Sequence, residues 1–204
     1  MLYYLDTVIA HGAISLELDA YGGFFVNATA DTIWQIPAYL PYLQPPLTSE
    51  VIDSAEKKIG YKLPTEYLNL LQTQNGGYIR FSLPEMVHDT IAGIGPYFPS
   101  LTGFDWDDCQ DYVSFPLQGL VPFDGDGHWH LCLDYRQNLN VPAVTYVDVE
   151  CDRQSRVADS FADYLLMLTV EVGDELVLES VSDLETVKSA LSFLLAITFE
   201  SPDV

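Results

Sequence analysis

Two histidines two residues apart, preceded by two aspartates, form the group in this sequence that most resembles a metal site. His128 and His130 follow Asp124 and Asp126 within one short segment. On a strand, residues two apart project from the same face, so both imidazoles point toward one ion. A zinc site needs three or four ligands, and the sequence has no second His-x-His pair and no Cys-x-x-Cys pair. We therefore expect neither a metal nor another cofactor, and interpret both histidines as polar-face residues of a strand.

Pairs of carboxylates, which glycoside hydrolases use, carry little information in so acidic a chain. Asp and Glu account for 30 of the 204 residues, so two that lie close together need no catalytic role. An acid catalyst also needs burial that raises its pKa, and a sequence does not reveal burial. No Gly-x-Ser-x-Gly, Walker or Gly-x-Gly-x-x-Gly motif is present. We predict that the protein is not an enzyme.

Aromatic rings set among carboxylates indicate a different chemistry, the binding of a basic partner. The segment 104–111 reads FDWDDCQD. Aromatic side chains supply much of the binding energy of interfaces, and aspartates around them attract a basic surface. The alternative is a solvated loop whose Phe104 and Trp106 pack into the core, and the sequence favours neither. On the first alternative, the predicted partner-binding residues are Asp105, Trp106, Asp107, Asp108, Asp111, Asp124 and Asp126.

Net charge narrows the class of partner. Eight Lys and Arg residues against 30 acids give a formal net charge of −22 at pH 7. Phosphate binding depends on Lys and Arg displacing counterions, so we exclude nucleic acid and anionic membranes as partners. The same charge speeds encounter with a basic protein, although it also serves solubility alone.

Cysteine usage and apolar patterning predict a cytoplasmic protein. Cys109, Cys132 and Cys151 form no disulfide framework, and we expect Cys132 and Cys151 to be buried in or beside strands. The first residues lack a basic region and a small-residue cleavage site. No apolar stretch reaches the roughly 20 residues that span a bilayer.

The elements that position these residues begin after a proline-rich boundary. Residues 1–47 contain no Lys or Arg and predict an N-terminal extension with short strands at 13–18 and 24–29. A helix then begins at Thr48 or Ser49 and ends at Gly60. A second helix opens at Pro64 and stops at the Asn-Gly-Gly sequence of residues 75–77.

Strands follow, and then one helix. Strands are predicted at 78–83, 119–123, 128–135 and 144–149. Alternation along 128–135 predicts a half-buried strand, with His128, His130, Cys132 and Asp134 on the polar face. A helix is predicted next, because apolar residues at helical spacing form one face of it, namely Val157, Ala158, Phe161, Leu165 and Leu168. Residues 171–204 predict an acidic helical C-terminal extension, which leaves 48–170 as the central domain.

Several short sequence words occur here in a characteristic order. They are LPTEY at 63–67, QNGG at 74–77, LVPF at 120–123, GDGHWHLCLDYR at 125–136, PAV at 142–144 and VADSFADYL at 157–165. From about residue 47 to about residue 170 the chain resembles the SUKH superfamily. The resemblance is to the branch of the yeast cell-wall (glucan) synthesis regulator and its bacterial immunity-protein relatives.

The resemblance implies an α+β fold in which a mixed, mainly antiparallel sheet is flanked by helices, here with N- and C-terminal extensions. Bacterial members are read as immunity proteins that neutralise toxins, often nucleases, and the family has no established catalytic residues. The resemblance and the charge together predict a non-catalytic, acidic module that binds and neutralises a basic toxin. The alternative is a regulatory or scaffold protein with an endogenous partner, as in cell-wall synthesis regulation.

Overall fold

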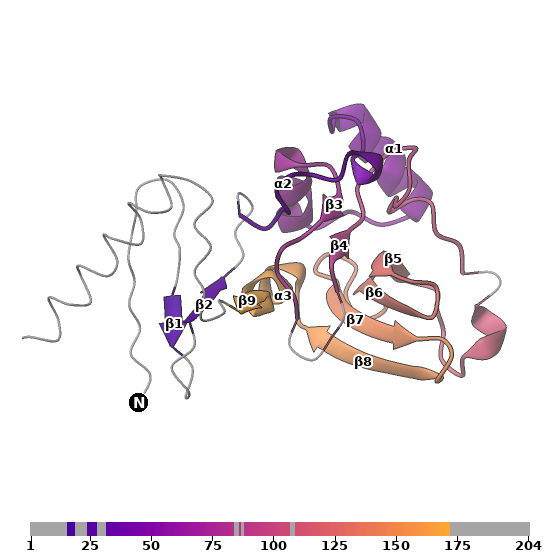
Figure 1. The fold of residues 1–204 in the computed structure, drawn as a ribbon. Helices are drawn as coiled ribbons and strands as arrows, with labels where there is room; N and C mark the ends of the chain where they lie inside the picture. Colours follow the sequence, from indigo (N-terminus) through magenta and orange to yellow (C-terminus); the bar gives the residue numbers. More distant parts are fainter. Residues whose placement is uncertain are drawn as a thin grey trace, which may run out of the picture. The chain divides into compact units, whose positions relative to one another are not determined.

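The structure, a computed structural model, describes residues 16–18, 24–27, 32–83, 86, 88–106 and 109–171 (Figure 1). The chain divides into two units, Met1–Glu171 and Val172–Val204. The second unit lies outside the described residues, as does the helix predicted there. The boundaries predicted at 47 and 170 therefore stay predictions.

Two helices open the central part of the chain where the sequence predicts them. Helix α1 spans Ser49–Ile59 and helix α2 spans Thr65–Thr73. The Thr48 hydroxyl accepts a hydrogen bond from Val51 N at 3.4 Å, and Gly60 ends α1 with a φ of 86°. That left-handed conformation suits glycine, which has no Cβ to clash.

The main sheet has four antiparallel strands in the order β5-β6-β7-β8. Their bounds are Leu120–Gly125, Trp129–Asp134, Ala143–Asp148 and Arg153–Ala158. At the turn after β5, Gly125 has a φ of 152°, and a Cβ there would lie 2.3 Å from the Trp129 carbonyl oxygen. In Figure 1, α1 and α2 lie above β5 and β6, and α3 (Phe161–Met167) lies beside one end of β7 and β8. The α+β prediction with antiparallel strands is confirmed.

Two smaller sheets complete the described part. Strands β3 (Gly77–Tyr78) and β4 (Thr90–Ile91) pair with each other. Strands β1 (Leu16–Leu18), β2 (Phe24–Asn27) and β9 (Thr169–Glu171) form an antiparallel sheet in the order β1-β2-β9. The strand predicted at 78–83 was too long, because beyond Tyr78 the backbone forms only isolated bridges at Ile79 and Ser82.

The helix after the main sheet begins later than predicted. Helix α3 spans Phe161–Met167, whereas Val157 and Ala158 belong to β8, so their placement on the helical stripe was wrong. Ser160 fixes the start, because its hydroxyl accepts a hydrogen bond from Asp163 N at 3.1 Å and donates one to the Asp163 carboxylate at 2.7 Å. This reciprocal pairing satisfies a backbone N–H that the first helical turn leaves free.

Strand β6 is buried on both faces, so the predicted half-buried strand was wrong. Leu131 and Leu133 pack into the main core among the helices, as expected. On the other face Cys132 is fully buried in a second cluster, with Val113, Leu117 and Val147. The segment before β5 supplies that cover. The alternation of apolar and polar residues along β6 indicates polarity and not burial. It therefore does not reveal that the segment before β5 covers the second face of this strand.

Of the two predictions of cysteine burial, one is correct and one is wrong. Cys132 is buried, as predicted, whereas Cys151 is exposed in the turn between β7 and β8, so its predicted burial was wrong. Among the described residues, no helix has the length and apolarity to cross a membrane.

Candidate functional site

A cleft of about 910 Å³ opens between the end of the main sheet and the loops that precede it. Three aspartates line it, namely Asp89, Asp124 and Asp126. Aromatic side chains line it too, and these are Tyr42, Tyr78, Tyr97, Phe98, Phe104, Phe123 and Trp129. We name this surface the acidic-aromatic cleft. Lys58 is the one Lys or Arg among the described residues that line it.

Aromatic rings in mutual contact form one wall of the cleft. Tyr42, in the 3₁₀ helix η1 (Leu40–Tyr42), stacks on Tyr78 of β3 with ring centroids 5.0 Å apart. Tyr39 and Phe98 meet Tyr42 edge to face, at 5.1 and 5.8 Å. Phe98 is 73% exposed. Contiguous exposed rings of this kind mark interaction sites on soluble proteins.

Two buried amides hold the loop that carries Phe98. Gln44 donates from Nε2 to the Pro99 carbonyl at 3.0 Å and accepts from Tyr97 N at 2.9 Å. Asn75 donates to the Ile94 carbonyl at 3.0 Å and accepts from Ile94 N at 2.8 Å. Because each amide satisfies both a donor and an acceptor of the loop backbone, the exposed ring is presented on a fixed frame.

The floor of the cleft rests on a buried polar chain that sequence reasoning missed. Asp124, in β5, accepts hydrogen bonds from His88 Nδ1 at 2.5 Å and from the Thr90 hydroxyl. His88 Nε2 pairs with the hydroxyl of Tyr164 in α3. The Asp124 side chain is 5% exposed and that of His88 is fully buried. Both His88 nitrogens are therefore occupied, and the group ties α3, β4 and β5 together.

The other two aspartates of the cleft sit in contrasting surroundings. Desolvation, and then the nearby Asp124 charge, raise the pKa of the Asp89 carboxyl. Desolvation also opposes ionisation of the exposed Asp126, but hydrogen bonds from the N–H groups of His128 and Trp129 outweigh it and lower the pKa of that carboxyl. The described ion pairs include neither residue. Both therefore present negative charge to the cleft at neutral pH.

His130 also lines the cleft and carries an unsatisfied nitrogen. The residue is 3% exposed, and its Nε2 has no hydrogen-bond partner in the described structure. The rings of Phe104 and Trp106 pack against the imidazole, with centroids 4.5 and 5.1 Å away. Burial lowers its pKa, so the imidazole is neutral at pH 7. It is not the exposed polar-face residue that the sequence predicted.

The predicted partner-binding residues fall in three places. Asp124 and Asp126 line the cleft. Asp105 is exposed on the preceding loop, and Asp111 is exposed in η2 (Gln110–Tyr112). Trp106 is half-buried against the second cluster and donates from Nε1 to the Leu120 carbonyl at 2.8 Å. The last two, Asp107 and Asp108, lie outside the described residues.

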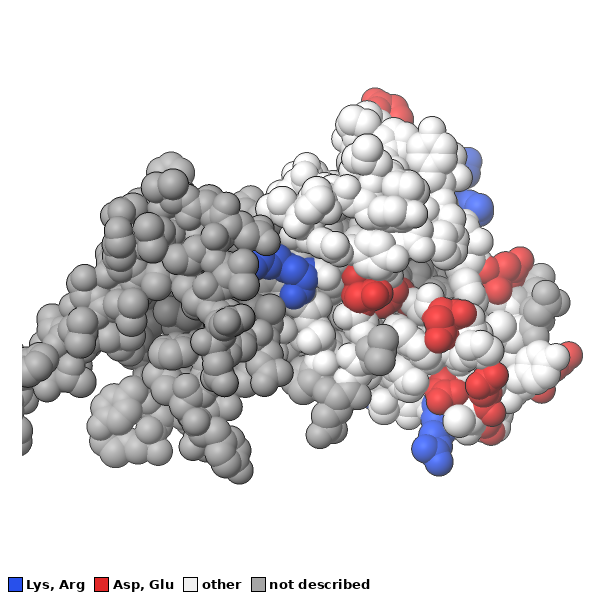
Figure 2. Space-filling model, viewed as in Figure 1, with Lys and Arg blue, Asp and Glu red and all other residues white. Residues whose placement is uncertain are grey.

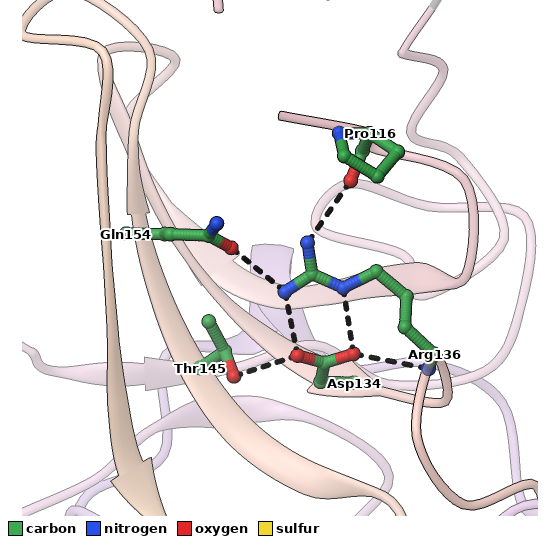
Figure 3. Close-up of polar contacts among 5 residues, drawn as sticks. All are labelled: Pro116, Asp134, Arg136, Thr145 and Gln154. Atoms are coloured by element: carbon green, nitrogen blue, oxygen red, sulfur yellow. Dashed lines mark hydrogen bonds and ion pairs between the residues drawn. The ribbon is translucent and has the colours of Figure 1, made fainter. Parts of the chain in front are cut away.

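A second cleft, of about 810 Å³, borders an arginine whose bonds indicate a structural role (Figure 3). Arg136 donates from Nε and Nη2 to the two oxygens of Asp134, at 2.9 and 2.7 Å. It also donates to the Pro116 carbonyl and to Gln154, while the Thr145 hydroxyl donates to Asp134. Burial opposes ionisation of Asp134, but these hydrogen bonds outweigh it and lower its pKa. The guanidinium thus joins the loop before β5 to β6 and β8.

Acidic side chains outnumber basic ones on the visible face of the described part of the chain. Figure 2 shows red carboxylate patches gathered around the main sheet, with few blue patches among them. Within the described ranges, no group of three or more His, Cys, Asp or Glu residues is placed to hold a metal ion. His128 lies just before β6 and its Nδ1 pairs with Glu150 at 2.7 Å.

The fold and cleft define an α+β domain without a recognisable metal centre in its described part. Comparison with protein families adds that the model of the SMI1 / KNR4 family (SUKH-1) matches residues 46–167, more than half of the chain. The chain belongs to this family, which confirms the resemblance seen in the sequence words. No curated protein matches the chain. Family membership indicates a general role in protein–protein interaction, immunity or regulation.

Proposed function

We propose that this protein is a non-catalytic, cytoplasmic binding module of the immunity type, which binds and neutralises a basic toxin such as a nuclease. The acidic-aromatic cleft is the observation that carries the proposal. It combines two carboxylates that belong to no described ion pair, Asp89 and Asp126, with exposed aromatic rings, which is the composition of an interface for a cationic surface. Family membership supports the same class of function.

Neutralisation follows from occupying the toxin's substrate-binding face. A nuclease binds its polyanionic substrate through Lys and Arg side chains. Carboxylates that bind those side chains would exclude the substrate without any chemical step. We place the predicted surface of Asp105, Asp111 and Trp106 beside the cleft as part of the same interface.

The absence of a catalytic role is supported by how the titratable side chains are used. The His88 imidazole is the natural candidate for a base, but Asp124 and Tyr164 occupy both of its nitrogens. Its side chain is fully buried, so no substrate atom reaches it. A general base needs hydrogen-bond access to the proton it removes.

Co-expression with the product of a toxin gene that neighbours this gene in the genome tests the proposal; if no toxin gene lies there, the immunity proposal loses its support. We expect the two proteins to copurify and the chain to restore growth of cells that express the toxin. A catalytically inactive toxin variant should copurify equally well, because occlusion needs no turnover. Absence of both copurification and growth rescue would contradict the immunity function.

A regulatory or scaffold role with an endogenous partner is the second candidate, because the family includes regulators as well as immunity proteins. Affinity capture from the native host separates the two. A captured housekeeping component, together with no adjacent toxin gene, favours the regulatory role.

A further inference from the structure

We propose that the acidic-aromatic cleft binds one Lys or Arg side chain of the partner protein, with its charged group between the Tyr42–Phe98 wall and Asp89. The inference rests on the proposed protein-binding function and names the chemical group that the cleft recognises. Three independent features of the cleft support it.

The first feature is the geometry of the aromatic wall. Tyr42 and Tyr78 stack with an interplanar angle of 27°, while Phe98 stands at 80° to Tyr42. The exposed Phe98 ring therefore stands nearly perpendicular to the stacked pair of tyrosines. The negative face of an aromatic ring attracts a cation, and the flat guanidinium of Arg stacks on it.

The second feature is the uncompensated charge of Asp89. Its carboxylate shares the cleft with Asp124, whose own oxygens are held by His88 and Thr90. No ion pair in the described structure involves Asp89. The negative charges of Asp89 and Asp124 repel each other. A cation placed beside Asp89 relieves this repulsion, whereas an anionic ligand increases it.

The third feature is a buried nitrogen of His130 that lines the cleft and has no hydrogen-bond partner in the described structure. Desolvation lowers the pKa of His130, and a hydrogen bond with the Gly127 backbone opposes that shift; because Nε2 has no partner in the described structure, we assign this bond to Nδ1. In the neutral imidazole Nε2 then carries a lone pair. An unsatisfied buried acceptor is rare, and a ligand N–H reaches this one when the Phe104 ring that packs on the imidazole moves aside. A guanidinium has five such donors, which favours Arg over Lys.

A peptide with one charged side chain tests the proposal. The probe is Gly-Arg-Gly blocked at both ends, compared with the lysine peptide and with the citrulline peptide, a neutral isostere of arginine. NMR titration of the full chain at low salt measures each affinity. We expect cleft resonances to shift with the arginine peptide and citrulline to bind about tenfold more weakly or not at all. Equal binding of arginine and citrulline would overturn the proposal.

Matched variants locate the binding. Phe98→Leu keeps an apolar side chain but removes the ring, and Tyr112→Leu does the same at an equally exposed position outside the cleft, each residue being 73% exposed. Asp89→Asn is matched by Asp53→Asn, an exposed carboxylate of α1. We expect the two cleft variants to weaken arginine-peptide binding about fivefold and the two controls to leave it within about twofold.

Thermal unfolding of all four variants checks that each is folded. Equal weakening by Asp89→Asn and Asp53→Asn would show that net charge alone attracts the peptide, and would overturn the proposal. Growth rescue by the wild-type chain without cleft binding of the peptide overturns this inference and leaves the proposed function standing. Specific peptide binding without growth rescue overturns the proposed immunity function and leaves this inference standing.

Discussion

Asp89 shows how a binding residue weakens the fold that carries it. Its pKa is raised by desolvation and by the Asp124 charge, so its ionised form is less favourable in the folded chain than in the unfolded chain. A group with a raised folded-state pKa holds more protons when folded, so it lowers stability as pH rises. Binding of a cation reverses that effect.

Asp89→Asn should therefore stabilise the protein near pH 7 while it weakens binding. We expect a gain of about 0.5 kcal/mol, kept small because the residue is exposed and solvent screens its charge. The gain should shrink as pH falls through the Asp89 pKa, because the wild-type carboxyl then becomes neutral. Urea unfolding at pH 7 and at pH 4 measures it. A loss of stability at pH 7 contradicts the interpretation.

The ion pair of Arg136 with Asp134 has the opposite effect on stability, because it lowers the pKa of the carboxyl instead of raising it. Asp134 has a lowered pKa, so its contribution to stability is present above its unfolded-state pKa of about 3.9 and is lost as pH falls through the lower folded value. We expect Arg136→Met to cost about 2 kcal/mol at pH 7, because it leaves the Asp134 carboxylate without its guanidinium. Denaturant unfolding checks the loss, with Arg153→Met on the exposed start of β8 as the control. Equal small effects of the two changes would contradict the structural role.

At the scale of elements, helix caps differ in strength in a way that is measurable. Ser160 makes a reciprocal pair with Asp163 at 3.1 and 2.7 Å, whereas Thr48 accepts from Val51 N at 3.4 Å. We expect Ser160→Ala to cost about 1 kcal/mol and Thr48→Ala about half as much. Thermal unfolding of both variants gives the comparison. A larger loss from the Thr48 change would show that hydrogen-bond length does not rank these caps.

The elements also show what a sequence reveals about this fold. Helices α1 and α2 were predicted with nearly the right ends, because Thr48, Gly60 and Pro64 are local signals. Strand β8 was missed, since Val157 and Ala158 fall at helical spacing with Phe161 and the rest of the strand is polar and exposed. The second face of β6 is buried by the segment before β5, which is distant in the sequence. The pattern of residues within β6 carries no information about that segment.

The same reasoning applies to the candidate site. Asp124 and Asp126 were named from the sequence, where acids and histidines cluster near β5, and both line the cleft, while their role in binding stays a prediction. The aromatic wall was missed, because Tyr42, Tyr78 and Phe98 are far apart in the chain and meet only when η1, β3 and the loop after β4 pack together. His88 was missed for the same reason, since its partners lie on other elements.

At the scale of the whole molecule, the net charge of −22 predicts a salt-dependent encounter. Long-range attraction to a basic partner is screened within about 8 Å at physiological ionic strength. We expect the association rate with a basic toxin to fall at least about tenfold between 20 and 500 mM salt, with a much smaller change in the dissociation rate. Stopped-flow mixing or surface binding measures both. An association rate that does not change with salt contradicts electrostatic steering.

The pairing of β2 with β9 constrains the order of events while the chain is being made. Val26 pairs with Val170, so one partner emerges from the ribosome early and the other only after the main sheet and α3 have been synthesised. The β1-β2-β9 sheet therefore cannot close on a nascent chain that stops before β9. Protease protection of ribosome-bound chains should accordingly reach the main sheet and α3 first and this small sheet last.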